Sequence, residues 1–192
     1  MRKIHPAEVL DLVEYEKARP EFQKKAMAAK AVRRIAVGPM ITCFFENRLT
    51  MHYQLQEMLR VERVVKDEAI AEETKVWNDL VPGRDELSMT LMVEITGEQD
   101  AKKILNDLVD LERHVALVIG ARRAPATFEE GWSDENKISA VQFIRFALSP
   151  EDVASLKRES DVRLSIDHPN YRHETRLPAE TVKALREDLD TP

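Results

Sequence analysis

The sequence predicts an α+β fold, with a single domain over residues 1–192 in which helices pack on a largely antiparallel sheet. Stretches with apolar residues at helical spacing are interspersed with stretches in which apolar and polar residues alternate. The alternating stretches are apolar on one face only, which is typical of antiparallel sheets and not of parallel sheets covered on both faces. No linker and no internal repeat divides the chain, so we expect one domain.

The first half of the chain is predicted to be mostly helical. Apolar residues near helical spacing predict a helix over about 6–18, and Pro20 is expected to start a second helix that ends before Gly38. The apolar stretch 40–45 predicts a strand. It leads into a long helix that we expect at about 46–77.

The second half is predicted to supply most of the sheet. Alternation of apolar and polar residues predicts strands at 87–95, 115–119, 138–148 and 162–166. Helical spacing and capping signals predict helices at 98–113, after the capping residue Ser149, and at 177–189. The acidic stretch 127–136 and the polar stretch 167–174 are expected to be loops.

The composition is that of a globular protein with a strongly charged surface. Hydrophobic residues make up 43% and charged residues 33% of the chain, and the net charge is −6. The acidic balance disfavours nonspecific attraction to nucleic acid or anionic lipid. We find neither an apolar run that could cross a bilayer nor the apolar core of a signal peptide. The single cysteine, Cys43, excludes an internal disulfide and a thiolate metal cluster, and we expect a cytoplasmic protein in which Cys43 is a core residue.

The helix that follows Glu46 carries more functional groups than folding requires. Glu46, Tyr53, Glu57 and Arg60 share one side of this helix, where they could line a groove or a partner surface, or form an ordinary solvated face. Glu62 falls within the apolar arc of the same helix. A carboxylate there must be paired, protonated or bound to a metal, because an unpaired buried charge costs several kcal/mol.

A second candidate site is the segment 167–174, which holds two imidazoles and two carboxylates. His168 and His173 could bind a divalent metal together with Glu57 or Glu62 if the fold brings them close. The alternative is that these side chains only form local hydrogen bonds. The sequence contains no Glu-x-x-His or His-Glu-x-x-His motif and no nucleotide or flavin motif, so a divalent metal is the one cofactor considered.

A third feature is the basic segment 17–34, which contains seven cations and one acidic residue. A solvated helix face is the favoured interpretation of this segment. The alternative is a nucleic-acid binder whose affinity falls steeply with salt. The residues that would bind are Lys24, Lys25, Lys30, Arg33 and Arg34.

Six short segments resemble a bacterial family of uncharacterised proteins, the domain of unknown function numbered three-five-zero-one. The segments are Val37-Gly38-Pro39, Phe45-Glu46-Asn47-Arg48, Thr50-Met51, Gln56-Glu57-Met58-Leu59-Arg60, Leu80-Val81-Pro82-Gly83-Arg84 and Ile166-Asp167-His168-Pro169. The resemblance covers nearly the whole chain. It implies a single-domain cytoplasmic protein whose gene often lies beside genes for rubrerythrin-like proteins and iron–sulfur oxidoreductases of the heterodisulfide-reductase type. It implies no catalytic residues.

The leading hypothesis is therefore an accessory or interaction protein in redox or oxidative-stress physiology, which works with a rubrerythrin-like or iron–sulfur partner through the Glu46–Glu62 helix. The first alternative is a metal-dependent enzyme or metal-binding protein, and the second is a nucleic-acid binder. A homodimer is the default assembly for a small protein of this kind.

Overall fold

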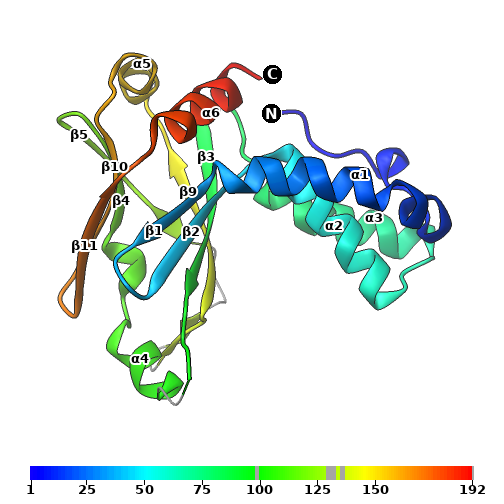
Figure 1. Cartoon of the computed structure of the whole chain (residues 1–192), viewed down its shortest axis with the longest axis horizontal. Helices are drawn as coiled ribbons and strands as arrows, with labels where there is room; N and C mark the ends of the chain where they lie inside the picture. Colours follow the sequence, from blue (N-terminus) through cyan, green and yellow to red (C-terminus); the bar gives the residue numbers. More distant parts are fainter. Residues whose placement is uncertain (98–99, 129–132, 135–136, 192) are drawn as a thin grey trace.

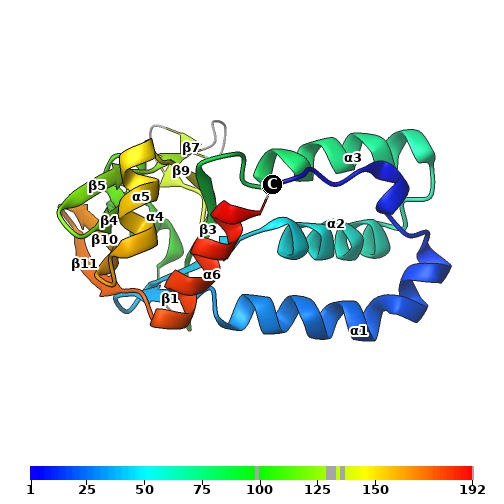
Figure 2. The ribbon, with the colours of Figure 1, turned by 90° about the horizontal axis from the view of Figure 1, so that it is seen from above.

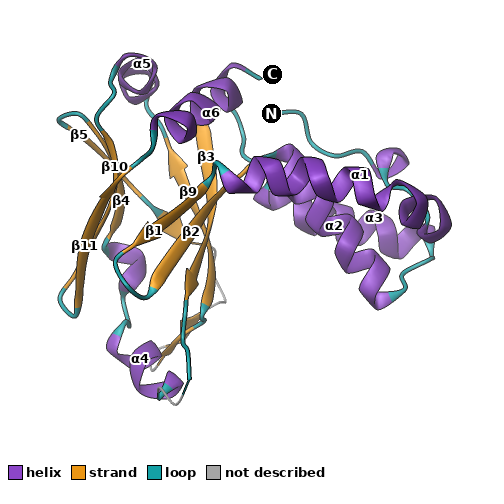
Figure 3. Ribbon diagram, viewed as in Figure 1, coloured by secondary structure: helices purple, strands orange, loops and turns teal. Residues whose placement is uncertain are grey.

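The structure is a computed structural model that describes residues 1–97, 100–128, 133–134 and 137–191. Two sheets face each other at one end, and three long helices extend from the other face of one sheet (Figure 1). Figure 3 shows that strands and long helices gather at opposite ends of the molecule. The predicted α+β class is confirmed, and all the described strand pairs are antiparallel, but the strands form two main sheets where one was expected.

The first sheet has the strand order β1-β2-β3-β9-β6, and the second has the order β11-β10-β4-β5. The strands of the first sheet are β1 Arg34–Val37, β2 Ile41–Glu46, β3 Glu86–Val93, β9 Val141–Ala147 and β6 Thr127–Phe128. Those of the second sheet are β11 Tyr171–Arg176, β10 Val162–His168, β4 Val115–Ile119 and β5 Arg122–Pro125. The two-residue strands β7 Ser133–Asp134 and β8 Lys137–Ile138 pair with each other.

The main hydrophobic core lies between the two sheets. Phe45 and Phe146 of the first sheet and Leu117 and Leu164 of the second are at most 1% exposed. Helices α5 (Pro150–Arg158) and α6 (Ala179–Asp190) cover one end of this sandwich (Figure 1). As predicted, Ser149 caps α5, and its hydroxyl accepts a hydrogen bond from the backbone N–H of the third helical residue at 3.1 Å.

The helical unit consists of α1 (Leu12–Ala31), α2 (Arg48–Glu62) and α3 (Asp67–Leu80), which lie side by side (Figure 2). It has a small core of its own, formed by Ile4, Met51, Leu55, Leu59 and Val81. Among the described residues, no helix is long and apolar enough to cross a membrane.

All three helices predicted in this unit differ from the structure. The first helix is only a 3₁₀ turn, Pro6–Glu8, and α1 continues through Pro20 without a break. A proline inside a helix frees the carbonyl four residues earlier, and here that carbonyl belongs to Glu16. Because Glu16 and Pro20 are both exposed, water can satisfy this group. The proline is tolerated for this reason.

The long helix expected at 46–77 is divided into α2 and α3. The chain leaves the helix at Arg63, which adopts the left-handed conformation with φ 53°. The backbone N–H of Val64 donates to the carbonyl of Leu59 at 3.0 Å and closes the helix end. The chain then reverses, and α3 returns alongside α2 (Figure 2). Left-handed helix ends are usually glycine, so the sequence carried no signal for this break.

Other boundaries also differ from expectation. The helix predicted at 98–113 is the short helix α4 (Ala101–Asp107) followed by the 3₁₀ turn η2 (Leu111–Arg113), and residues 98–99 lie outside the described residues. The predicted loop 167–174 is wrong, because β10 and β11 meet there in a tight hairpin. The predicted loop 127–136 contains β6 and β7, and its other residues, 129–132 and 135–136, lie outside the described part of the chain.

Candidate functional site

A cleft of about 590 Å³ lies between the helical unit and the outer face of the first sheet. This volume is in the range of small-molecule pockets, roughly 300–1,000 Å³. The helical unit contributes Met27, Lys30, Ala31, Met51, Gln54 and Trp77 to its lining. The sheet contributes Arg34, Phe44, Glu46, Thr90, Met92, Val141 and Phe143.

Strand alternation places the sheet residues of the cleft. Along β2, Cys43 and Phe45 point into the sandwich core, so their neighbours Phe44 and Glu46 point to the opposite face. Thr90 of β3 lies directly across from Phe44 on one side and from Phe143 of β9 on the other. The floor of the cleft is therefore a cross-strand row of two aromatic rings and a threonine, with Glu46 beside it.

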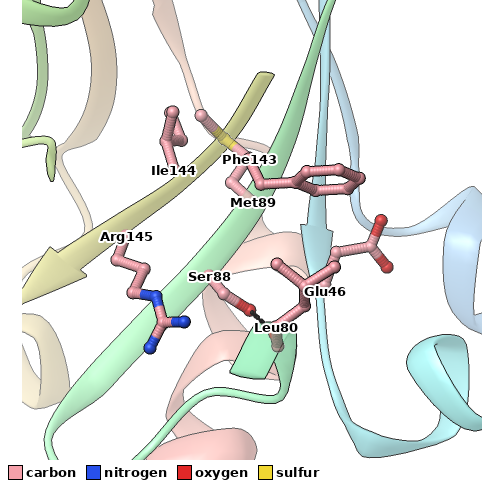
Figure 4. A pocket seen from close by; sticks show the side chains of 7 residues that line it. All are labelled: Glu46, Leu80, Ser88, Met89, Phe143, Ile144 and Arg145. Carbon is pink, nitrogen blue, oxygen red and sulfur yellow. Dashed lines mark hydrogen bonds between the residues drawn. The ribbon is translucent and has the colours of Figure 1, made fainter. Parts of the chain in front are cut away.

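Glu46 is the most unusual group of the cleft. The residue is only 6% exposed, and its Oε1 accepts a hydrogen bond from the hydroxyl of Thr90 at 2.8 Å. Its Oε2 is buried and has no hydrogen-bond partner among the described residues. In Figure 4 the carboxylate points away from Ser88 and Leu80, toward the side on which the helices lie. A buried carboxylate oxygen without a donor is energetically unfavourable.

Next to the cleft, and sharing Glu46 and Phe143 with it, is a hollow of only about 10 Å³ (Figure 4). Its lining includes Leu80, Ser88 and Arg145, and the hydroxyl of Ser88 donates to the carbonyl of Leu80 at 2.8 Å. A space of this size holds about one water molecule and no organic ligand. The hollow is therefore too small to be a second site for an organic ligand.

The mouth of the cleft is basic. Lys30 Nζ donates to Gln54 Oε1 at 3.4 Å and lies 6.0 Å from the ring centroid of Tyr53. The Arg34 guanidinium lies 5.9 Å from the ring centroid of Phe44, which it partly covers. Arg34 also forms an exposed ion pair with Glu94 at 3.3 Å, which offsets its charge. Of the two cations that line the cleft, Lys30 therefore has no acidic partner among the described residues.

The predicted row on α2 divides between two places. Glu46, the last residue of β2, lines the cleft, whereas Glu57 and Arg60 face α1. Tyr53 is 6% exposed and is therefore also buried. The row is not a solvated helix face, because α1 packs over it.

Glu57 joins α1 to α2. Its Oε1 accepts hydrogen bonds from the hydroxyl of Tyr15 and from Nε of Arg19, both at 2.7 Å, and its Oε2 accepts from Arg19 at 3.0 Å. The hydrogen bonds from Arg19 are the main reason that the pKa of Glu57 is lowered to about 2. Burial and the neighbouring Glu57 carboxylate raise the pKa of the Tyr15 hydroxyl. Both oxygens of Glu57 are satisfied inside the protein, so this residue holds two helices together.

The four predicted metal ligands do not come together. Glu57 and Glu62 lie in the helical unit, whereas His168 and His173 lie on the β10–β11 hairpin at the other end of the molecule (Figures 1 and 2). Among the described residues, no group of three or more His, Cys, Asp or Glu side chains could hold a metal ion. Glu62 is exposed rather than buried, because it is the last residue of α2 and the apolar arc ends before it.

The two histidines have structural partners. His168 is 4% exposed, and its Nε2 lies 2.8 Å from the carbonyl oxygen of Val109, while its Nδ1 accepts from the backbone N–H of Asn170 at 3.2 Å. In this pattern Nε2 donates and Nδ1 accepts. His173 is exposed and lies against Tyr171, with ring centroids 4.5 Å apart. For His168, the hydrogen bond with Asn170 is local, whereas the one with Val109 joins segments 59 residues apart.

The basic segment is also divided by the fold. Arg33 is 5% exposed and forms a buried ion pair with Asp188 of α6, with Nη2 and Oδ1 at 2.9 Å. Lys30 and Arg34 lie at the mouth of the cleft, and Lys24 and Lys25 are exposed on α1. The five residues therefore do not form one continuous basic face.

Sequence reasoning missed the aromatic lining of the cleft, Phe44, Trp77 and Phe143. A signal was present in the strands, because β2 and β9 carry large apolar residues at successive positions and therefore on both faces. A sheet whose outer face is also apolar must be covered by something else. Here the helical unit covers it incompletely and leaves the cleft.

Comparison with known proteins places this chain in a family. A family model described as "Protein of unknown function (DUF3501)" matches residues 3–189. A crystal structure of a novel protein of unknown function from Burkholderia pseudomallei K96243 is similar, with a TM-score of 0.91 and 29% sequence identity over 98% of this chain and 100% of that chain. No curated protein matches. Since the family model covers nearly the whole chain, the protein belongs to the DUF3501 family of proteins of unknown function.

Proposed function

We propose that this protein binds a small amphipathic molecule in the cleft between the helical unit and the first sheet. The observation that carries the proposal is the cleft itself, which has about 590 Å³ of space and mainly apolar walls. Its lining combines aromatic rings and methionine side chains with a few polar groups, which is the usual composition of a ligand pocket. The function proposed is reversible binding.

The position of the cleft supports this proposal. It lies where two separately packed units meet, with the sandwich core on one side and the small core of the helical unit on the other. Met51 belongs to the small core and also lines the cleft, and Trp77 packs against the same core. A bound molecule would therefore contact both units, and it would stabilise their arrangement by mass action.

The redox setting implied by the family resemblance is the wider role that we propose for such a binding protein. An accessory protein could carry or sense a small molecule for a rubrerythrin-like or iron–sulfur partner. Because Glu57 and Arg60 lie in the α1–α2 joint, the contact surface that we propose is the mouth of the cleft, at Lys30 and Arg34. Replacing both with glutamate should abolish co-purification of the partner from the native host, and retention would place the contact elsewhere.

Methionine methyl groups give a direct test of binding. Met27, Met51 and Met92 line the cleft, whereas Met1 and Met58 do not. Titration of 1-octanol into protein with ¹³C-methyl methionine should shift the NMR signals of the first three and leave those of the last two unchanged. The chain has seven methionines, so each signal can be assigned by single substitution.

A filled cleft provides the matched control. Ala31 lines the cleft at the end of α1, and Ala28, one turn earlier, is exposed and does not line it. We expect Ala31→Trp to abolish the octanol-dependent shifts and Ala28→Trp to leave them intact. Equal shifts in both variants, or shifts at Met1 and Met58, would place binding outside the cleft and contradict the proposed function.

A further inference from the structure

We propose that the ligand of this cleft is an organic amine, protonated at neutral pH, whose nitrogen binds the free Oε2 of Glu46. This inference rests on the proposed function, because it specifies the chemistry of a molecule held in the same cleft.

The Glu46 carboxylate is fixed and incompletely satisfied. Burial of more than nine-tenths of the residue restricts its motion, and the hydrogen bond from Thr90 at 2.8 Å orients Oε1. Oε2 has no hydrogen-bond partner among the described residues. An ammonium group would supply both a donor and the opposite charge, and charge-assisted hydrogen bonds are roughly twice as strong as neutral ones. A neutral ligand would supply only the donor.

The walls beside Glu46 also suit a cation with an apolar body. Phe44, Phe143 and Trp77 all line the cleft. The faces of aromatic rings attract cations, and the attraction increases when water is excluded. Methionine side chains adapt to irregular apolar shapes, and three of them are present. An alkyl or aryl amine can therefore place its charged nitrogen at the carboxylate and its apolar body against these side chains.

The distribution of charge orients such a ligand. Glu46 is the one carboxylate among the described lining residues, whereas Lys30 and Arg34 lie at the mouth. The Glu94 carboxylate, 3.3 Å from Arg34, offsets one of these two cations. An amine is therefore attracted to the inner end, and a polar group at its far end can reach Lys30. A simple carboxylic acid would meet repulsion at Glu46.

Three probes with the same chain length separate the contributions. Octylammonium, 1-octanol and octanoate share an apolar body and differ in the charge of the head group. We expect the wild-type protein to bind octylammonium about tenfold to a hundredfold more tightly than octanol, as for hydrogen bonds to charged groups, and to bind octanoate most weakly. Isothermal titration calorimetry below the micellar concentration measures all three affinities.

Two variants locate the preference. Glu46→Gln keeps an acceptor for Thr90 and removes the charge, so octylammonium and octanol should bind with similar affinity. Glu94→Gln removes a carboxylate at the mouth, where the side chain is 42% exposed, and should keep the preference for the amine. Thermal melting confirms that each variant is folded. The order of the three binding affinities in the wild-type protein is a test that requires no variant.

The outcomes distinguish this inference from the proposed function. Equal affinities for octylammonium and octanol in the wild type would overturn the inference, although the cleft would still bind small molecules. An amine preference that survives Glu46→Gln would also overturn it, because another group would be responsible. If none of the three probes shifts the cleft methionines, the proposed function itself fails.

Discussion

Replacing Glu57 with glutamine should make the protein less stable at neutral pH and less sensitive to acid. Glu57 accepts three hydrogen bonds from α1, and its pKa is lowered from an ordinary value of 4.5 to about 2, first by Arg19 and then by Tyr15. At about 1.4 kcal/mol per pH unit, this difference corresponds to about 3 kcal/mol. Because the side chain is 18% exposed and solvent screens it, we expect about half of that value.

The direction of the pH dependence follows from the lowered pKa. A carboxylate whose pKa is lower in the folded state contributes its stability above the unfolded value of about 4.5, and loses it as the pH falls toward the folded value of about 2. The free energy of unfolding of the wild type should therefore fall between pH 6 and pH 3 by about 1 kcal/mol more than that of Glu57→Gln. Urea denaturation followed by circular dichroism at both pH values gives the two differences.

Glu62→Gln is the matched control for this experiment. Glu62 lies on the same helix, is exposed, and is five residues farther along the chain. Its replacement should leave the wild-type pH dependence unchanged within about 0.5 kcal/mol. The reasoning would be refuted if Glu57→Gln and Glu62→Gln gave the same stability at pH 6 and the same loss at pH 3.

Three further predictions concern the sandwich and its link to the helices. Gly38→Ala should lower the free energy of unfolding by about 2 kcal/mol more than Gly97→Ala does. Both glycines have positive φ, but only the new Cβ at position 38 would lie 2.5 Å from a ring carbon, that of His173 in β11. Equal losses in urea denaturation would contradict this. Asp188→Asn should cost about 3–5 kcal/mol by leaving the buried Arg33 guanidinium without its counter-charge, and a loss below about 1 kcal/mol would show that the pair contributes little. Burial raises the pKa of the Cys43 thiol, so iodoacetamide should modify it only after denaturation, and fast modification of the native protein would contradict its placement in the core.

The alternation of apolar and polar residues predicted those strands that bury one face only. The alternation in 87–95 corresponds to β3, because its apolar residues face the core between the sheets. The break at Arg63 was not predictable in the same way, since it depends on a left-handed residue that is not glycine. Strand β1 was also missed, because four residues that begin with an arginine, just after a basic helix, carry too short a pattern.

The candidate site was only partly predictable because it is assembled from distant segments. Glu46 was singled out as part of a row of functional groups on one side of a predicted helix, and it lines the cleft from the end of β2. Its importance depends on Thr90, which satisfies one oxygen, and on Trp77 and Phe143, which enclose the space. These residues become neighbours only through strand pairing and the return of α3, neither of which a local pattern records. Glu57 resembled a surface group in the sequence because α1, which covers it, is far away along the chain.

The most direct test of the account is a crystal structure of the protein with octylammonium bound. We expect the alkyl chain to lie between Met51 and Phe143, with the nitrogen within hydrogen-bonding distance of Glu46 Oε2 and the Thr90 hydrogen bond retained. A cleft closed by its own side chains, with Lys30 paired to Glu46 and the amine bound elsewhere, would contradict the central claim.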